Sequence, residues 1–149
     1  MNHSFTVPYS ELRIPPRGSF PQKIVHSPIL QTHLSFQGNP LGFLFSSVVD
    51  SGADHCIFPA EFGEKIGLNI QSGNHIPSRG LGGGDVVYFH RVTIQIILEK
   101  QSWEFTSDVG FSRKMNQLGV GFLGRKGFFE LFDEVTFYEN QRKFKLIEY

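Results

Sequence analysis

The β-branched pair Val48-Val49 runs directly into Asp50-Ser51-Gly52, with the apolar run Phe43-Leu44-Phe45 just before it. This pattern predicts a buried strand that ends abruptly and leaves a carboxylate at its tip with a hydroxyl beside it. Gly52 lets the chain turn sharply and lets a second backbone approach closely. Asp, Ser and Gly are also common in ordinary solvated turns, but such turns do not need apolar residues on both sides. The flanking residues therefore favour a functional loop at Asp50.

The composition predicts an all-β fold in a single domain. The 149 residues include 16 Phe, 16 Gly and 8 Pro, and no long segment has a helical period rich in Ala, Leu, Glu and Lys. We expect strands over residues 29–36, 42–49, 86–98, 103–111 and 120–125, and a closing hairpin from 135–138 and 143–147. Short helices are expected at 59–68 and 126–132. Residues 1–28 are expected to form an irregular lead-in, and residues 29–149 the folded domain.

Charge and cysteine content exclude several classes of protein. The formal net charge is zero and the basic residues are scattered, so the chain has no electrostatic footprint for nucleic acid or an anionic membrane surface. The N-terminus has no apolar run as long as a signal peptide or a membrane span. Cys56 is the only cysteine, so no intrachain disulfide can form. These features predict a cytoplasmic protein in a reducing compartment.

A glycine cluster, Gly80-Leu81-Gly82-Gly83-Gly84, precedes the strongly β-forming run of residues 86–98. It predicts the tip of a hairpin, either a plain flexible hairpin or a lobe that lies over a ligand. A phosphate-binding loop is disfavoured, because the glycines lead into a strand instead of a helix and no Lys follows them.

A second motif, Phe122-Leu123-Gly124-Arg125, closes another apolar strand downstream. With Asp50-Ser51-Gly52-Ala53, the glycine-tipped hairpin between the two motifs and a helix expected after the second, the chain resembles a retropepsin-type aspartic protease. This single-domain class includes the retroviral proteases and their cellular relatives. The resemblance covers roughly residues 29–147 and rests on the order, spacing and apolar flanks of the motifs together. It implies a closed acid-protease barrel with one lobe per chain and an active site formed in a homodimer.

The resemblance implies a role for each residue of the first motif. Asp50 would be the catalytic aspartate, and the hydroxyl of Ser51 would brace the two active-site loops. Gly52 and Ala53 would line the substrate backbone.

The resemblance also implies roles for the hairpin and for the second motif. Gly80, Leu81, Gly82 and Gly83 would form the tip of a flap that contacts substrate, with Leu81 nearest to it. Asp54 would take part in substrate binding and pair with Arg125. Phe122, Leu123 and Gly124 would support the active-site loop, although Phe122 stands where a branched aliphatic residue is usual.

Hydrolysis by an aspartic dyad needs two carboxylates about one water apart, one ionised and one protonated, as in aspartic proteases generally. Two such close carboxylates share one proton and titrate as a unit. The chain has one Asp-Ser-Gly; its nearest imitation, Asp108-Val109-Gly110, lacks the hydroxyl. A working dyad would therefore require two copies of Asp50 across the two-fold axis of a homodimer. Its substrate would be a peptide or an unfolded protein, with apolar residues favoured beside the cut.

Other chemistries fit the sequence less well, and no cofactor or metal is expected. His55 is the one histidine next to candidate acids, and no His-x-x-x-His arrangement occurs. Ser51 lacks the Gly-x-Ser-x-Gly context of a serine nucleophile. Cys56 has an apolar setting, which is more typical of a small core residue than of a nucleophile. The serious alternative is a retropepsin-like module that dimerises or binds peptides without catalysis.

Overall fold

Short apolar segments separated by turns form strands throughout the chain, as the composition predicts. The structure is a computed structural model that describes residues 3–80 and 83–149. The strands are β1 (Ser4–Pro8), β2 (Ser10–Ile14), β3 (Lys23–Ser27), β4 (Ile29–Phe36), β5 (Asn39–Pro40), β6 (Phe45–Val49), β7 (Ile57–Pro59), β8 (Asn74–Gly80), β9 (Gly83–Ile97), β10 (Ser102–Ser112), β11 (Gly121–Leu123), β12 (Phe132–Tyr138) and β13 (Lys143–Glu148). The helical segments are α1 (Ala60–Lys65) and the 3-10 turns η1 (Ile70–Ser72), η2 (Lys114–Gln117), η3 (Phe129–Leu131) and η4 (Glu139–Gln141).

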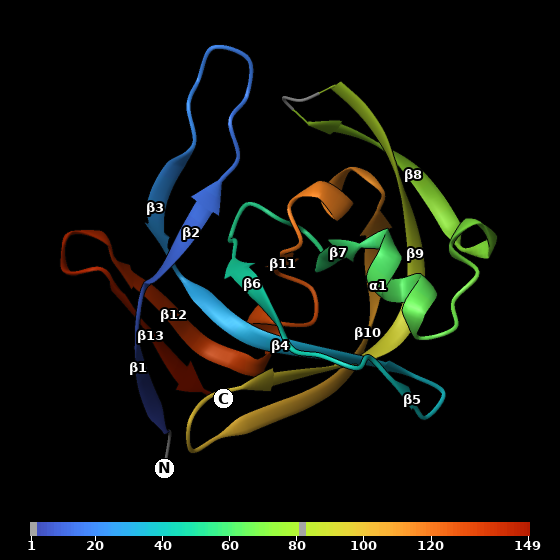
Figure 1. Cartoon of the computed structure of the whole chain (residues 1–149). Coiled ribbons are helices and arrows are strands. Elements are labelled where there is room, and N and C mark those ends of the chain that lie inside the picture. Colours follow the sequence, from blue (N-terminus) through green and yellow to red (C-terminus); the bar gives the residue numbers. More distant parts are fainter. Residues whose placement is uncertain (1–2, 81–82) are drawn as a thin grey trace.

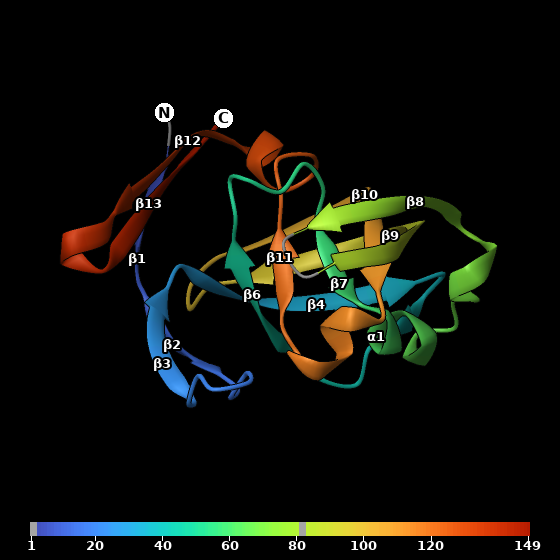
Figure 2. The same ribbon diagram turned by 90° about the horizontal axis from the view of Figure 1, so that it is seen from above.

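The central sheet closes into a barrel (Figures 1 and 2). Strands β4, β6, β11, β7, β10 and β9 pair in this order, and a further antiparallel pairing between β9 and β4 completes the ring. Strand β5 pairs with β4, and β8 pairs with β9, outside the ring. The expected all-β barrel is confirmed. Within the described residues, no helix combines the length and apolar character needed to cross a membrane.

Two parallel pairings lie among the antiparallel ones. Strand β6 pairs in parallel with β11, and β7 pairs in parallel with β10, while β11 lies between β6 and β7. Because parallel strands end at the same edge of a sheet, the loops that follow β6 and β11 emerge side by side. These are the loops that carry Asp50 and Gly124.

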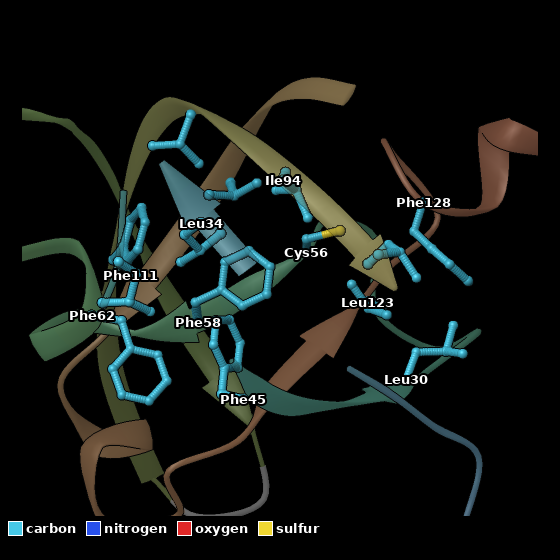
Figure 3. Close-up of a cluster of buried hydrophobic side chains, with 14 of the residues drawn as sticks. Leu30, Leu34, Phe45, Cys56, Phe58, Phe62, Ile94, Phe111, Leu123 and Phe128 are labelled. Atoms are coloured by element: carbon cyan, nitrogen blue, oxygen red, sulfur yellow. The ribbon is translucent and has the colours of Figure 1, made fainter. Parts of the chain in front are cut away.

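The barrel is filled by aromatic and branched side chains. In β6, Phe45, Ser47 and Val49 are buried and alternate with half-buried residues, as expected for a strand with one face on the core. The buried Ser47 hydroxyl accepts a hydrogen bond from the Thr32 hydroxyl at 2.9 Å, which offsets the cost of burying both. Figure 3 shows the centre of the core, which includes Leu34, Phe45, Cys56, Phe58, Phe62, Ile94, Phe111, Leu123 and Phe128.

The N-terminal segment differs from the expectation of an irregular lead-in, because most of it is strand. Strand β1 pairs antiparallel with β13, from Ser4 opposite Ile147 to Pro8 opposite Lys143, and β13 pairs with β12. Strands β2 and β3 form a separate hairpin. Half-buried Phe5 and Val7 alternate with exposed neighbours in β1. This short alternation is stabilised by a partner at the far end of the chain, so the local composition alone did not indicate it.

The prediction of a second helix at residues 126–132 is wrong. The segment contains only the turn η3, and β12 begins at Phe132. Gly127 has φ +95°, a left-handed conformation that interrupts a right-handed helix. Phe128 and Phe132 are nevertheless buried and lie with ring centroids 5.2 Å apart, so the apolar spacing serves packing without a helix. The first helix, α1, is present, and Gly67 with φ +99° follows its end.

Candidate active site

Asp50 follows β6 directly, and its backbone and side chain are both held by hydrogen bonds. Its amide donates to the Leu123 carbonyl oxygen at 3.0 Å, which continues the β6–β11 pairing by one residue. Its Oδ1 accepts from the Gly52 amide at 2.9 Å, and its carbonyl accepts from the Ala53 amide at 3.2 Å. The carboxylate is thereby fixed in a tight turn at the end of a buried strand.

Gly52 stands close to this carboxylate. A Cβ at residue 52 would lie 3.2 Å from Asp50 Oδ1, tighter than most Cβ contacts. A side chain there would push against the group that the Gly52 amide holds. The turn therefore uses glycine to make room for the side chain of Asp50, whereas the sequence predicted room for a second backbone.

A second loop, which follows β11, runs beside the first. The Arg125 amide donates to the Ala53 carbonyl at 2.8 Å, and the Lys126 amide donates to the Asp54 carbonyl at 2.9 Å. These backbone bonds join two segments that are far apart in the sequence. The structure thus brings the two motifs of the sequence together in one site.

Gly124 is where the two loops touch. A Cβ at this position would overlap the His55 carbonyl and would lie 2.8 Å from the Ala53 carbonyl oxygen. Both obstacles are backbone atoms, which cannot rotate away as a side chain can. Only glycine fits at this position without moving one of the loops.

Arg125 and Asp54 form an ion pair across the same loops. Arg125 Nη1 lies 3.8 Å from Asp54 Oδ1, and their side chains are 68% and 81% exposed. An exposed ion pair at this distance contributes roughly 1 kcal/mol or less to the stability of the fold. In the single chain the ion pair therefore does little to hold the loops together. The backbone hydrogen bonds between the loops do so.

Cys56 connects the two loops from the core side. It is fully buried, and its Sγ lies 3.4 Å from the Gly124 amide, which donates to it, and 3.7 Å from the Lys126 carbonyl, which accepts from it. Burial raises the pKa of the thiol from 9.0 to about 11, although the bond from the Gly124 amide lowers the pKa. The thiol is therefore protonated at neutral pH and is not a nucleophile. The sequence gives no local sign of these two hydrogen bonds, because the groups that Cys56 contacts lie in and next to the second motif.

Ser51 and Asp50 differ in exposure. Ser51 is exposed, and in the described part of the chain its hydroxyl makes no hydrogen bond. Asp50 is half-buried. The ring of His55 packs edge-on against Phe89 of β9, with centroids 4.9 Å apart, and no group of three or more metal-binding side chains occurs among the described residues. The site offers a half-buried carboxylate next to an exposed hydroxyl.

The other predicted site residues lie on β8, β9 and β11. Gly80 and Gly83 form the last pair of the β8–β9 hairpin, which has its tip where the sequence predicts it; Leu81 and Gly82 lie outside the described residues. Leu123 is fully buried, whereas Phe122 is half-buried and pairs with Val48 and with Ile57. Phe122 and Leu123 therefore project to opposite sides of β11, with Leu123 in the core and Phe122 on the outer face.

Comparison with solved structures shows a similar fold. A crystal structure of a retropepsin-like aspartic protease from Rickettsia conorii matches with a TM-score of 0.57 at 12% sequence identity. The match covers 99% of this chain and 92% of that chain. No protein-family model matches the sequence, and neither does any curated protein. The chain thus has the retropepsin-like fold, and the similarity includes the N-terminal strands as well as the barrel.

Gly124→Ala tests the contact between the loops. We expect this substitution to lower the free energy of unfolding by about 1–3 kcal/mol, because the new methyl group meets backbone carbonyls that cannot move aside. Gly42→Ala is the matched control, since no atom lies within 4 Å of a Cβ at that position, and it should change stability by less than about 0.5 kcal/mol. Equal unfolding midpoints in denaturant for the two variants would contradict this reading of the contact.

The buried thiol predicts a loss of stability at alkaline pH. In the unfolded chain Cys56 ionises from about pH 9, whereas in the folded chain it stays protonated up to about pH 11. Its contribution, about 2–3 kcal/mol at full shift, is present below pH 9 and is lost as the pH rises through 11. Unfolding in denaturant at a series of pH values should show a steeper alkaline loss for the wild type than for Cys56→Ala. Parallel curves would show that the thiol is not protected by burial.

Proposed function

We propose that this chain is an aspartic endopeptidase whose active site is completed in a homodimer. The observation that carries the proposal is the placement of Asp50. Its carboxylate is fixed by the Gly52 amide at the end of β6, beside the exposed Ser51 hydroxyl. The retropepsin-like fold supports the proposal, because in such a fold two chains can supply the two carboxylates.

The proposed chemistry uses one Asp50 from each subunit. The ionised carboxylate takes a proton from a water molecule while the water oxygen attacks the carbonyl carbon of the peptide bond. The protonated carboxylate donates its proton to the carbonyl oxygen, which gives a gem-diol. When the carbon–nitrogen bond breaks, one hydroxyl of the gem-diol returns a proton to that carboxylate, and the leaving nitrogen takes the proton that the first carboxylate had removed from the water. The shared proton is retained over a range of acidic pH, because like charges so close together cannot both ionise.

We assign supporting roles to the neighbouring residues. Ser51 would contact the second subunit's loop, which accounts for a hydroxyl that is exposed in the single chain. Gly52 and Ala53 would lie against the substrate backbone. The tip of the β8–β9 hairpin would cover the substrate as a flap. The Arg125–Asp54 pair, exposed in the single chain, would gain strength if a partner subunit covered it and reduced its contact with water.

Asp50→Asn tests proteolysis directly. Without an ionisable carboxylate, cleavage of a mixture of unstructured peptides from about pH 4 to about pH 7, followed by mass spectrometry, should fall by about a hundredfold or more. Asp108→Asn is the matched control, because Asp108 also stands two residues before a glycine, Gly110, but lies within β10 and forms a surface ion pair with Arg91 at 3.7 Å. A non-catalytic peptide-binding module would instead show no cleavage in any form and unchanged or tighter peptide binding in Asp50→Asn.

The need for two copies of Asp50 predicts a dependence on protein concentration. Specific activity should fall in proportion to the dimer fraction as the protein is diluted, because a single chain holds one carboxylate of the pair. Sedimentation velocity over the same dilution series gives the dimer fraction independently. Full specific activity in samples that sediment as monomers would refute the shared site.

A further inference from the structure

An open pocket lies between the tip of the β2–β3 hairpin and the barrel. Its volume is about 360 Å³, within the range of pockets that bind small ligands or a few side chains. On the barrel side it is lined by Ile57 and Phe122, and on the hairpin side by Pro15, Pro16 and Arg17. Figure 1 shows that the β2–β3 hairpin projects from the same end of the molecule as the β8–β9 hairpin.

The barrel wall of this pocket is joined directly to the strand that carries Asp50. Phe122 pairs with Val48 of β6 and with Ile57 of β7, and Asp50 lies two residues after Val48. Residues paired in this way share one face of a sheet. The pocket therefore borders the face beside the proposed catalytic carboxylate.

The interior of the pocket is suited to an apolar group. Ile57, Phe122 and the two prolines contribute carbon atoms, and proline has no backbone N–H to satisfy. The one carboxylate in the lining, that of Asp85, is already engaged, because it accepts hydrogen bonds from the Ser112 hydroxyl and the Val86 amide. The lining also contains the cationic side chains of Arg17 and Lys114, but most of its residues are apolar, so an apolar group would bury its surface there.

The hairpin tip stands over the pocket without filling it. A segment that blocked the site would occupy this volume, yet about 360 Å³ stays open beneath the tip. The tip is closed by two backbone bonds between Arg17 and Phe20, at 2.9 and 2.8 Å. The base of the hairpin is anchored by two hydrogen bonds. The Tyr9 amide donates to the Arg142 carbonyl oxygen, and the Val49 amide donates to the Pro28 carbonyl oxygen. The hairpin is thus fixed at its base, next to the Asp50 strand.

We propose that the β2–β3 hairpin forms one wall of a specificity pocket that takes a large apolar side chain of the peptide substrate. This inference rests on the proposed function, since the pocket borders the Asp50 face. The barrel contributes Ile57 and Phe122, and Leu118, which follows η2, also lines the pocket. The selectivity of the site for a large apolar residue depends on residues 15–17.

Shortening the hairpin tests the wall. Residues 15–22 are replaced by Asn-Gly, which closes a two-residue turn after the pair formed by Ile14 and Lys23. Binding is measured by fluorescence anisotropy in the Asp50→Asn protein, with short unstructured labelled peptides that differ only in a central Phe-Phe or Ala-Ala pair. The full hairpin should bind the Phe-Phe peptide at least about tenfold more tightly, and the shortened hairpin should lose most of this preference.

A milder variant tests the same pocket if the shortened hairpin fails to fold. Leu118→Ser, at a leucine that is 46% exposed, should reduce the preference for Phe-Phe by about fivefold, because part of the contact area is lost. Leu44→Ser is the matched control, since Leu44 is 51% exposed and lies outside the pocket, and it should leave the preference unchanged.

The outcomes separate this inference from the proposed function. An equal preference with and without the hairpin tip, or no preference in the protein with the intact hairpin, overturns the specificity pocket. A preference that depends on the tip, together with an absence of cleavage by the protein that retains Asp50, supports the pocket and overturns the protease. Cleavage with the same dependence on the tip supports both.

Discussion

The structure of the site depends on the parallel pairing of β6 with β11. This pairing continues past the end of β6 through the bond from the Asp50 amide to the Leu123 carbonyl, and then through the bonds that Arg125 and Lys126 donate to the other loop. Backbone bonds of this kind have fixed geometry, so they hold the carboxylate more precisely than exposed side chains could. Gly124 is what allows the loops to come this close.

The pairing in turn depends on the barrel beneath it. Strands β6 and β11 each bury one face among aromatic side chains, and the β4–β9 pairing closes the sheet so that the ring strands are paired on both sides. Cys56 extends this support to the loops, because its buried sulfur contacts backbone groups of the second loop. The core therefore extends along the chain to Cys56, two residues after the exposed Asp54, while Asp50 is half-buried and Ser51 is exposed.

The terminal strands place the N-terminal hairpin beside the site. Strand β1 is held by β13, and the chain enters β2 just after Tyr9. The Tyr9 amide donates a hydrogen bond to the Arg142 carbonyl, which fixes the direction of the hairpin. The return strand β3 leads through Pro28 into β4, and the Pro28 carbonyl accepts from Val49, next to Asp50. Both ends of the chain are thus used to position a hairpin at the pocket, a role that differs from that of a passive lead-in.

The sequence by itself determined the features that depend on neighbouring residues. The strand before Asp50, the glycine turn, the glycine-tipped hairpin, the closing hairpin around residues 139–142 and the first short helix follow from local periodicity and turn chemistry, and the structure contains each of them. The resemblance to retropepsins also implied that the second motif would support the loop of the first. Four features depended on the tertiary structure. They are the pairing of strand β1, the hydrogen bonds of the Cys56 thiol, the turn in place of a helix at residues 126–132, and the pocket under residues 15–17. Each of these depends on a partner far away in the sequence or on a backbone angle such as that of Gly127, which no local pattern reveals.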